Sequence, residues 1–188
     1  GIGTTTRFNM PSGVLVENNI LYIAERGNNK IKKMDLATKN VTLLSSGAPL
    51  NTPEQMTLVG GYLYLANLGG NNIVRADKTS GAMVVFAGDS ASSTGNTDGV
   101  GTSARFFGLT GITADQKSLY VGDYFNNTVR RVDIATQKVT TLAGNGTASQ
   151  GGGVGIGASI VNTSYMTTDG KNFYFTSFHS LRKFTNNA

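Results

Sequence analysis

Short apolar segments separated by turn-forming residues run along the whole chain. In the first part they occupy residues 14–16, 21–24, 31–34 and 41–44, with Asn, Gly, Asp and Thr between them. Residues of these types tolerate left-handed backbone or cap their own turns, so they favour tight hairpins. Four short strands joined in this way predict a four-stranded antiparallel sheet.

The pattern recurs along the sequence. Residues 1–46 and 99–144 align without a gap, a diverged unit lies between them, and a fourth ends the chain. The second-strand anchors of the four units are Leu21-Tyr22, Leu63-Tyr64, Leu119-Tyr120 and Phe173-Tyr174. A fixed period of this kind is typical of repeat architectures, in which each unit buries its faces against its neighbours.

Four-stranded units of about 40–55 residues have the size of β-propeller blades. We therefore predict one all-β propeller domain over residues 1–188, with blades at approximately 10–46, 53–87, 106–143 and 160–188. The fourth unit has three strands, so its third strand, Leu181-Arg182-Lys183-Phe184, is predicted to leave an open edge for pairing. Three completions stay open: further blades of a larger, six-bladed ring, another chain, or a closed four-bladed ring without the last strand.

Several segments resemble the NHL-repeat propellers, in particular their bacterial form. The third unit carries Gly99-Val100-Gly101-Thr102-Ser103-Ala104-Arg105-Phe106, then Leu119-Tyr120-Val121-Gly122-Asp123, Asn126-Asn127, Val129-Arg130-Arg131 and Val139-Thr140-Thr141-Leu142-Ala143-Gly144. The match is strong in units one and three and partial in the others. The resemblance implies a propeller fold but no single function, because the family includes binding scaffolds, RNA binders and distant enzyme relatives.

The composition narrows the range of possible functions. The chain has no cysteine, which excludes disulfides and thiolate sites, and no apolar run long enough to span a membrane. It begins at Gly1, so we expect a processed product or a fragment whose targeting signal is not included.

The net charge of +5 invites a nucleic-acid interpretation, but the cations are dispersed. Those on the third strands, Lys32, Lys33, Arg75, Arg130 and Arg131, are the candidate ligand contacts, and a structural or solvated role is favoured for them.

Paired carboxylates are the first candidates for chemistry. Glu25 and Asp123 end the second strand in units one and three, each shortly before a cationic strand, and Asn67 and Ser177 occupy the same place in the other units. A metal or acid–base role is one interpretation. We favour a repeated hydrogen bond to a third-strand cation or a turn amide.

Other candidates are weighed in the same way. Arg7 and Arg105 precede Phe8 and Phe106, which we expect to be core plugs, with the arginines bound to loop carbonyls. Asp89 and Asp98 belong to a Gly/Ser/Thr-rich stretch, residues 87–105, that could hold calcium but has no matching ligand spacing, so a flexible loop is favoured. His179, the single histidine, cannot build the multi-histidine metal site used by lyases of related fold.

We therefore predict a non-enzymatic scaffold or binding module, extracellular or periplasmic, that binds another protein or a glycan. We also expect it either to form a homo-oligomer or to have its missing blades supplied by the rest of the protein. No cofactor or metal is expected, and nucleic acid is not the expected partner. One alternative is a nucleic-acid-binding face, which would require cations gathered on one side. The other is an enzyme of the lyase or lactonase type, which would require polar residues converging on the central channel.

Overall fold

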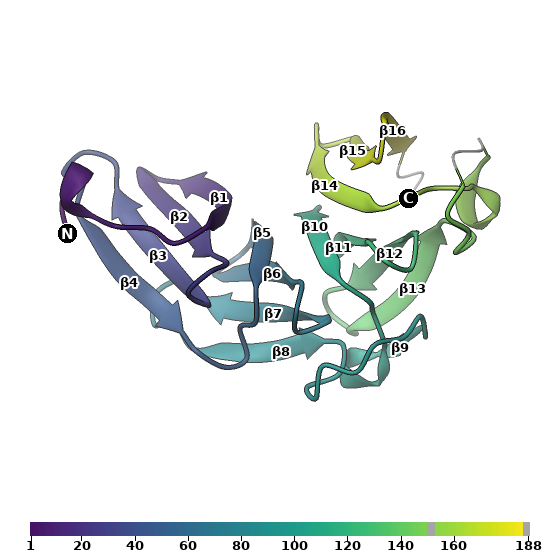
Figure 1. Ribbon diagram of the computed structural model, residues 1–188, viewed down its shortest axis with the longest axis horizontal. Coiled ribbons are helices and arrows are strands. Elements are labelled where there is room, and N and C mark those ends of the chain that lie inside the picture. The colour runs from purple at the N-terminus through teal and green to yellow at the C-terminus, as the bar shows by residue number, and fades with distance from the viewer. Residues whose placement is uncertain (150–152, 186–188) are drawn as a thin grey trace.

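The computed structural model, which describes residues 1–149 and 153–185, consists of four small antiparallel sheets that follow one another around an open arc (Figure 1). The prediction of an all-β propeller with four blade units is confirmed. No helix of the described residues is long and apolar enough to cross a membrane.

The first two blades have the expected four strands in chain order. Blade one contains β1 (Pro11–Glu17), β2 (Ile20–Glu25), β3 (Lys30–Asp35) and β4 (Val41–Ser46). Blade two contains β5 (Pro53–Val59), β6 (Tyr62–Asn67), β7 (Asn72–Asp77) and β8 (Met83–Ala87). In both, the first strand lies innermost and the fourth lies at the rim (Figure 1).

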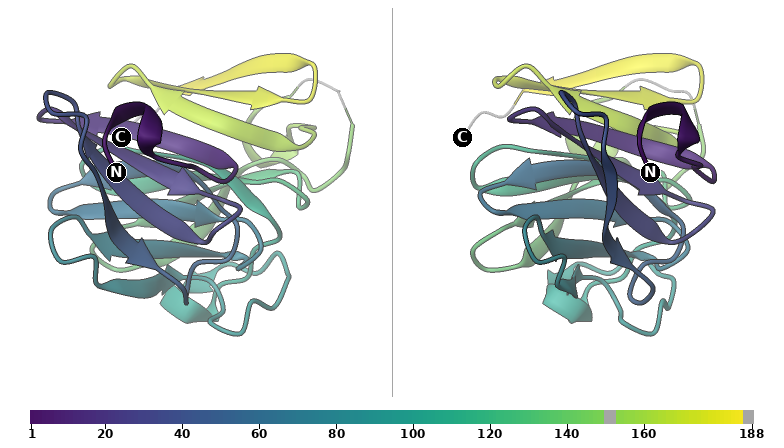
Figure 2. Two further views of the ribbon diagram at one scale, coloured as in Figure 1. Left: turned by 60° about the vertical axis from the view of Figure 1, so that its left-hand side comes forward. Right: turned by 90° about the vertical axis from the view of Figure 1, so that its left-hand side faces the viewer.

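Blade three has one strand more than the sequence predicts. It contains β10 (Leu109–Ala114), β11 (Ser118–Asp123), β12 (Thr128–Asp133) and β13 (Lys138–Ala143), and β9 (Gly99–Val100) pairs with the outer edge of β13. The stretch 87–105 is therefore not a featureless loop: it forms β9 and the 3-10 turn η2 (Gly101–Ser103) and projects at the lower end of both side views (Figure 2).

The equivalent segment of blade one behaves similarly. Ile2 forms a β-bridge with Asn40, and the Val41 N–H donates to the Gly1 carbonyl at 2.8 Å. The 3-10 turn η1 (Gly3–Thr5) follows it, as η2 follows β9.

Blade four contains β14 (Thr163–Thr168), β15 (Asn172–Ser177) and β16 (Ser180–Thr185), preceded by the turn η3 (Gly155–Gly157). Within the described residues β16 has β15 as its only neighbour, so Leu181 to Phe184 lie on an edge strand, as the sequence predicts.

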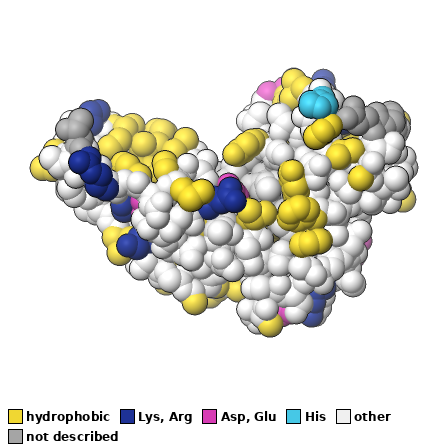
Figure 3. Space-filling view, viewed as in Figure 1, with side chains coloured by type: hydrophobic (Ala, Val, Ile, Leu, Met, Phe, Trp, Pro, Cys, Tyr) yellow, Lys and Arg dark blue, Asp and Glu magenta, His cyan; other side chains and the backbone are white. Residues whose placement is uncertain are grey.

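The core lies between blades. In blades one to three a tyrosine on the second strand faces the next blade: Tyr22 packs with Leu63 and Leu65, and the centroid of the Tyr120 ring lies 3.9 Å from that of Phe173. Blade one has no blade before it among the described residues, and its outward face exposes the apolar side chains Val14, Val16 and Leu43. Hydrophobic side chains accordingly gather over this blade in Figure 3.

The innermost strands approach one another closely. A Cβ atom at Gly111 would lie 1.9 Å from the Ser164 carbonyl oxygen, so only glycine fits at this point of β10. Blade two has Gln55 at the corresponding place, and its side chain crosses the centre of the arc. Its Oε1 accepts from the N–H groups of Ile112 and Met166, and its Nε2 donates to the Met166 carbonyl at 2.7 Å. Gln55 thereby links blade two to blades three and four.

Candidate binding site

Each blade presents two side chains to the same end of the arc, near its centre. One is the second residue of the first strand, and the other directly follows the second strand. These positions hold Ser12 and Arg26 in blade one, Glu54 and Leu68 in blade two, Thr110 and Tyr124 in blade three, and Ser164 and Phe178 in blade four.

Most of these side chains enclose a hollow of about 260 Å³, which we call the axial cup. It is lined by Arg26, Glu54, Leu68, Thr110, Tyr124, Phe125, Ser164 and Tyr165. All four blades contribute to the cup, so its shape depends on how the blades pack together.

One hydrogen bond, repeated in every blade, holds the two lining segments together. The last residue of the second strand accepts from the backbone N–H of a residue just before the first strand. The pairs are Asn9 N–H to Glu25 at 2.9 Å, Asn51 N–H to Asn67 at 2.7 Å, Phe107 N–H to Asp123 at 2.8 Å and Val161 N–H to Ser177 at 3.0 Å. The hydrogen bonds favoured for Glu25 and Asp123, to a turn amide and to a third-strand cation, are therefore observed.

An ion pair lies in the cup. Arg26 Nη1 lies 2.9 Å from Glu54 Oε1, with the Glu54 side chain buried and the Arg26 side chain partly exposed. Burial raises the pKa of Glu54, and the positive charge of Arg26 opposes that rise. The pair offers a ligand one hydrogen-bond acceptor and one exposed donor at adjacent points.

Aromatic rings surround this pair. The Phe125 ring lies 4.7 Å from Phe107 and 4.9 Å from Tyr124, and Tyr165 is 56% exposed. Phe178, also exposed, contacts the ring of His179 at 3.9 Å, but neither lines the cup. Figure 3 shows the face that carries the single histidine (cyan), with hydrophobic side chains beside basic and acidic ones near its middle.

The sequence-predicted cations are not brought together. Lys32 and Arg130 occupy one repeat position and are engaged internally: Lys32 pairs with Glu25 at 3.0 Å and donates to the Arg7 carbonyl. Arg130 is fully buried, 2.9 Å from Asp123 and 2.6 Å from Asp98. Arg130 is thus engaged inside the protein, in line with the structural role favoured for these cations, and its buried guanidinium is not exposed to a ligand.

The other three cations share a second repeat position. Lys33, Arg75 and Arg131 lie on the third strands directly opposite the tyrosines Tyr22, Tyr64 and Tyr120. They lie on three successive blades and do not form a common cationic face.

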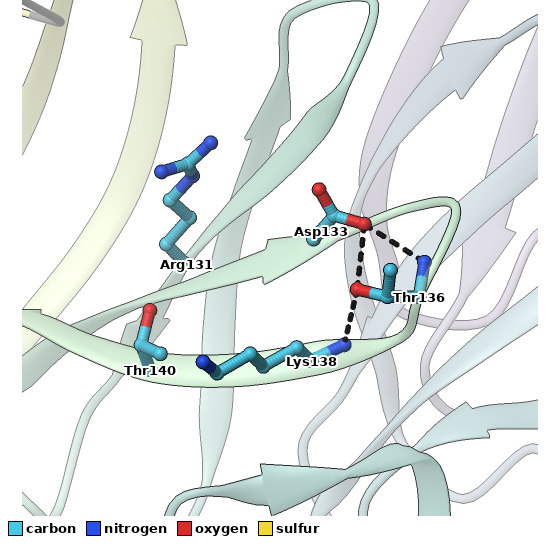
Figure 4. Close-up of a pocket in the computed structure, with 5 residues that line it drawn as sticks. All are labelled: Arg131, Asp133, Thr136, Lys138 and Thr140. Carbon is cyan, nitrogen blue, oxygen red and sulfur yellow. Dashed lines mark hydrogen bonds between the residues drawn. The ribbon is translucent and has the colours of Figure 1, made fainter. Parts of the chain in front are cut away.

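Arg131 lines a shallow hollow of about 210 Å³ on blade three (Figure 4). There Asp133 Oδ1 accepts from the Thr136 N–H and hydroxyl groups, at 2.8 and 2.7 Å, and Lys138 and Thr140 lie beside them. The carboxylate is thus used by the turn. The same Asp-to-Thr or Asp-to-Ser turn occurs in blades one and two, which indicates a structural role.

The remaining sequence candidates also have structural partners. Arg105 donates to the carbonyls of Thr102 and Ala104, as expected. Phe106 is fully buried, but Phe8 is 40% exposed beneath the Lys32 ammonium, so Phe8 is not a core plug; no described blade precedes it to enclose the ring.

The two aspartates of stretch 87–105 are bound within the protein. Asp89 accepts from the Ala91 N–H, and Asp98 accepts from Arg130 and Thr141. Partial burial acts to raise the pKa of Asp98, yet the bonds from Arg130 and Thr141 hold it below its ordinary value. No group of three or more potential metal-ligating side chains occurs in the described residues.

Sequence reasoning missed the cup because it followed residues that repeat. The position after the second strand holds Arg26, Leu68, Tyr124 and Phe178, four different chemistries on a constant scaffold. Such variation at one position of an otherwise regular repeat is the signal that could have revealed it, because loops carry function while strands carry packing.

No protein-family model matches the chain. The curated NHL repeat-containing protein 2 of Bos taurus is 25% identical over 265 residues, covering 88% of this chain and 36% of that protein. A solved structural genomics protein of unknown function from Bacteroides thetaiotaomicron superposes with a TM-score of 0.81 at 22% identity, over 93% of this chain and 47% of that one.

An auxiliary nutrient binding protein from Bacteroides ovatus superposes with a TM-score of 0.74 at 22% identity, over 92% of this chain and 47% of its own. The chain thus spans about half the length of these solved structures and just over a third of the curated relative.

Proposed function

We propose that this β-propeller, whose sequence is similar to that of an NHL repeat-containing protein, is a non-catalytic binding module whose axial cup recognises a glycan. The observation that carries the proposal is the convergence of a buried ion pair, Arg26 and Glu54, with exposed aromatic rings in one cup.

A sugar ring has an apolar face and a rim of hydroxyl groups. Phe125 and Tyr165 offer apolar ring surface to the apolar face of the sugar. The Glu54 carboxylate offers a hydrogen-bond acceptor to the hydroxyl groups, and the Arg26 guanidinium offers a donor. The cup, at about 260 Å³, is small for a ligand site, so it fits the end of a glycan better than the middle of a long chain.

The polar groups of the cup favour binding over catalysis. Glu54 is the one carboxylate of the lining, and it is held by Arg26. The Thr110 hydroxyl donates to the Thr163 carbonyl at 2.8 Å, which occupies its proton. A nucleophile needs an adjacent base and a glycosidase needs two carboxylates, and neither arrangement occurs in the lining.

We place this module outside the cytoplasm, at the cell envelope or in the extracellular space. The name of the Bacteroides ovatus neighbour, an auxiliary nutrient binding protein, supports nutrient binding as the role of this module. A protein partner remains the alternative occupant of the cup, because exposed aromatic side chains are also typical of protein interfaces.

The test is a glycan array followed by calorimetry with each oligosaccharide that binds. Tyr165→Ala and Glu54→Gln should each weaken binding about tenfold or more, since each removes a main contact. The matched control is Tyr62→Ala, which removes an exposed tyrosine from outside the cup and should leave affinity unchanged.

Three results would contradict the proposal. They are an array without hits, affinity that survives both cup variants, and cleavage of a bound glycan on prolonged incubation. Tight binding of single-stranded RNA at about 200 mM salt would instead support the nucleic-acid alternative, because scattered cations lose affinity steeply with salt.

A further inference from the structure

The shallow hollow on the outer half of blade three, which we call the rim hollow, carries polar groups that the turn beside it does not use. Its volume is about 210 Å³. Its lining comes from β12, β13 and the turn between them, and consists of Arg131, Asp133, Thr136, Lys138 and Thr140 (Figure 4). No residue of the axial cup belongs to this lining, so the two sites are separate.

The Arg131 side chain is held at one end and open at the other. Its Nε donates to the Ser118 hydroxyl at 3.0 Å, and its two Nη atoms make no hydrogen bond or ion pair with a described residue. Arg75, at the same repeat position in blade two, lies instead over the Tyr62 ring, 4.6 Å from its centroid. Ser118 replaces that tyrosine in blade three. The outer end of the Arg131 guanidinium is therefore oriented by Ser118 and is left with unused donors.

Two side chains of β13 add further donors. Within the described part of the chain, the Lys138 ammonium and the Thr140 hydroxyl make no hydrogen bond. Blade two has Ala82 and Val84 at these two positions, and blade one has Asn40 in place of Lys138. Among the outer strands β4, β8 and β13, only β13 thus carries a cation here. As in the axial cup, the chemistry varies on a constant scaffold.

The carboxylate of Asp133 determines what else a ligand must offer. Hydrogen bonds from the N–H and hydroxyl of Thr136 to Oδ1, together with the charge of Arg131, hold the pKa of Asp133 below its ordinary value, so it is ionised at neutral pH. Two cations, Arg131 and Lys138, face this one carboxylate, so the lining attracts an anion overall. The second oxygen, Oδ2, takes no part in the bonds drawn in Figure 4 and can accept from a hydroxyl group.

The hollow is open because of its position within a blade. At the equivalent positions of blades one and two, Asn40, Thr42, Ala82 and Val84 are all exposed. A four-stranded blade follows blade one, and a five-stranded blade follows blade two. A complete following blade therefore leaves this part of the face accessible, and the rim hollow does not depend on what completes blade four.

We propose that the rim hollow binds a sulfate or phosphate ester, whose oxygen atoms accept from Arg131, Lys138 and Thr140 while a neighbouring hydroxyl group of the same ligand donates to Asp133. Guanidinium and ammonium groups make strong charge-assisted hydrogen bonds to such oxyanions. At about 210 Å³ the hollow is smaller than a typical ligand pocket, so it fits one charged group and the sugar-like unit that carries it. This site is independent of glycan binding in the axial cup.

The test is a titration of the whole nitrogen-15-labelled chain, followed through its backbone amide shifts by nuclear magnetic resonance. The probes are glucose 6-phosphate, glucose 6-sulfate, glucose, inorganic phosphate and inorganic sulfate. At least one ester should shift the amides of residues 131–140 saturably, with a Kd of about 1 mM or tighter. The ester with the lower Kd identifies the source of the group. Glucose should cause no such shifts, and the inorganic ions should bind more weakly because they offer Asp133 no sugar hydroxyl.

Protein variants locate the site. Lys138→Asn introduces the residue of blade one at an exposed position and should weaken binding of the ester about fivefold. Lys117→Asn is the matched control, because it removes the same charge from an exposed lysine of blade three outside the lining, and it should change the Kd less than about twofold. Tyr165→Ala, in the axial cup, should leave the Kd unchanged.

Any of four results would overturn the proposal. Neither ester causes saturable shifts, or the two lysine variants weaken binding equally, which would indicate diffuse attraction to a basic protein. The inorganic ions bind as tightly as the esters, which would leave the contact with Asp133 without a role. Binding is lost in Tyr165→Ala, which would move the ligand to the axial cup and separates failure of this site from failure of the glycan site.

Discussion

Replacing Arg130 by methionine should be one of the costlier single substitutions in this protein. The Arg130 side chain is fully buried, and its guanidinium lies 2.9 Å from Asp123 and 2.6 Å from Asp98. Methionine keeps most of the apolar stem but leaves Asp123, which is equally buried, without its cation. Breaking one side of a buried pair typically costs about 3–5 kcal/mol.

For a chain of this size, about 1 kcal/mol lowers the melting temperature by about 2–4 °C. The variant should therefore melt about 6–20 °C below the parent protein. Since the chain contains no tryptophan, urea and thermal unfolding are best followed by far-ultraviolet circular dichroism.

Arg131→Met is the matched control, because Arg131 is the next residue and is only half-buried. Its Nε donates to the Ser118 hydroxyl at 3.0 Å, a bond worth about 1 kcal/mol or less. The double variant Asp123→Asn with Arg130→Met should recover part of the loss, since blade two has Asn67 and the apolar Val74 at these two positions. Equal stabilities of the Arg130 and Arg131 variants would refute the reasoning.

Three further outcomes follow from the packing and the turns. Phe106→Ala should cost about 3–5 kcal/mol in urea unfolding because the ring is fully buried, whereas Phe8→Ala at the same repeat position should cost less than about 1 kcal/mol. Gln55→Ala should cost about 2–4 kcal/mol by the same measurement, since it leaves the N–H and carbonyl of Met166 without their partner. Hydrogen bonds from the side chain and N–H of Asn172 hold the pKa of Asp169 well below its ordinary value. Ionised Asp169 therefore contributes to the free energy of unfolding above about pH 4, and this contribution is lost as the pH falls. Asp169→Asn should accordingly reduce the loss of stability at acid pH in a stability–pH profile.

The strands were predictable because burial imposes a regular pattern. The Leu21-Tyr22 anchor and its three counterparts lie on second strands, and each of these strands packs against at least one neighbouring blade, so the apolar pattern located the four blades. The apolar pattern did not predict the two-residue strand β9, because Gly99 and Val100 pair through their backbone and need no alternation of apolar residues. Phe8 and Phe106 have similar local sequences, but among the described residues a blade precedes only Phe106, which a repeat alignment cannot show.

The site was less predictable for a related reason. Arg26 and Glu54 come from different blades, and they meet because inner strands converge on one axis. Neither residue belongs to a motif: Arg26 lies in the turn after β2, and Glu54 is the second residue of β5. The burial of Arg130 was not predictable either, because Asn96 and Asp98 bind its guanidinium and no local pattern encodes the path of that segment across the rim.

The repeated bond from the end of each second strand has a consequence for how such a chain can diverge after its units duplicate. Any side chain that accepts a hydrogen bond can hold the backbone N–H, so the position tolerates Glu, Asn, Asp or Ser. A carboxylate there also needs a cation seven residues later, as Lys32 follows Glu25 and Arg130 follows Asp123, whereas Asn67 is followed by Val74. In blades one and three the two positions are therefore coupled, because a change at only one of them removes the partner of the buried carboxylate or of its cation.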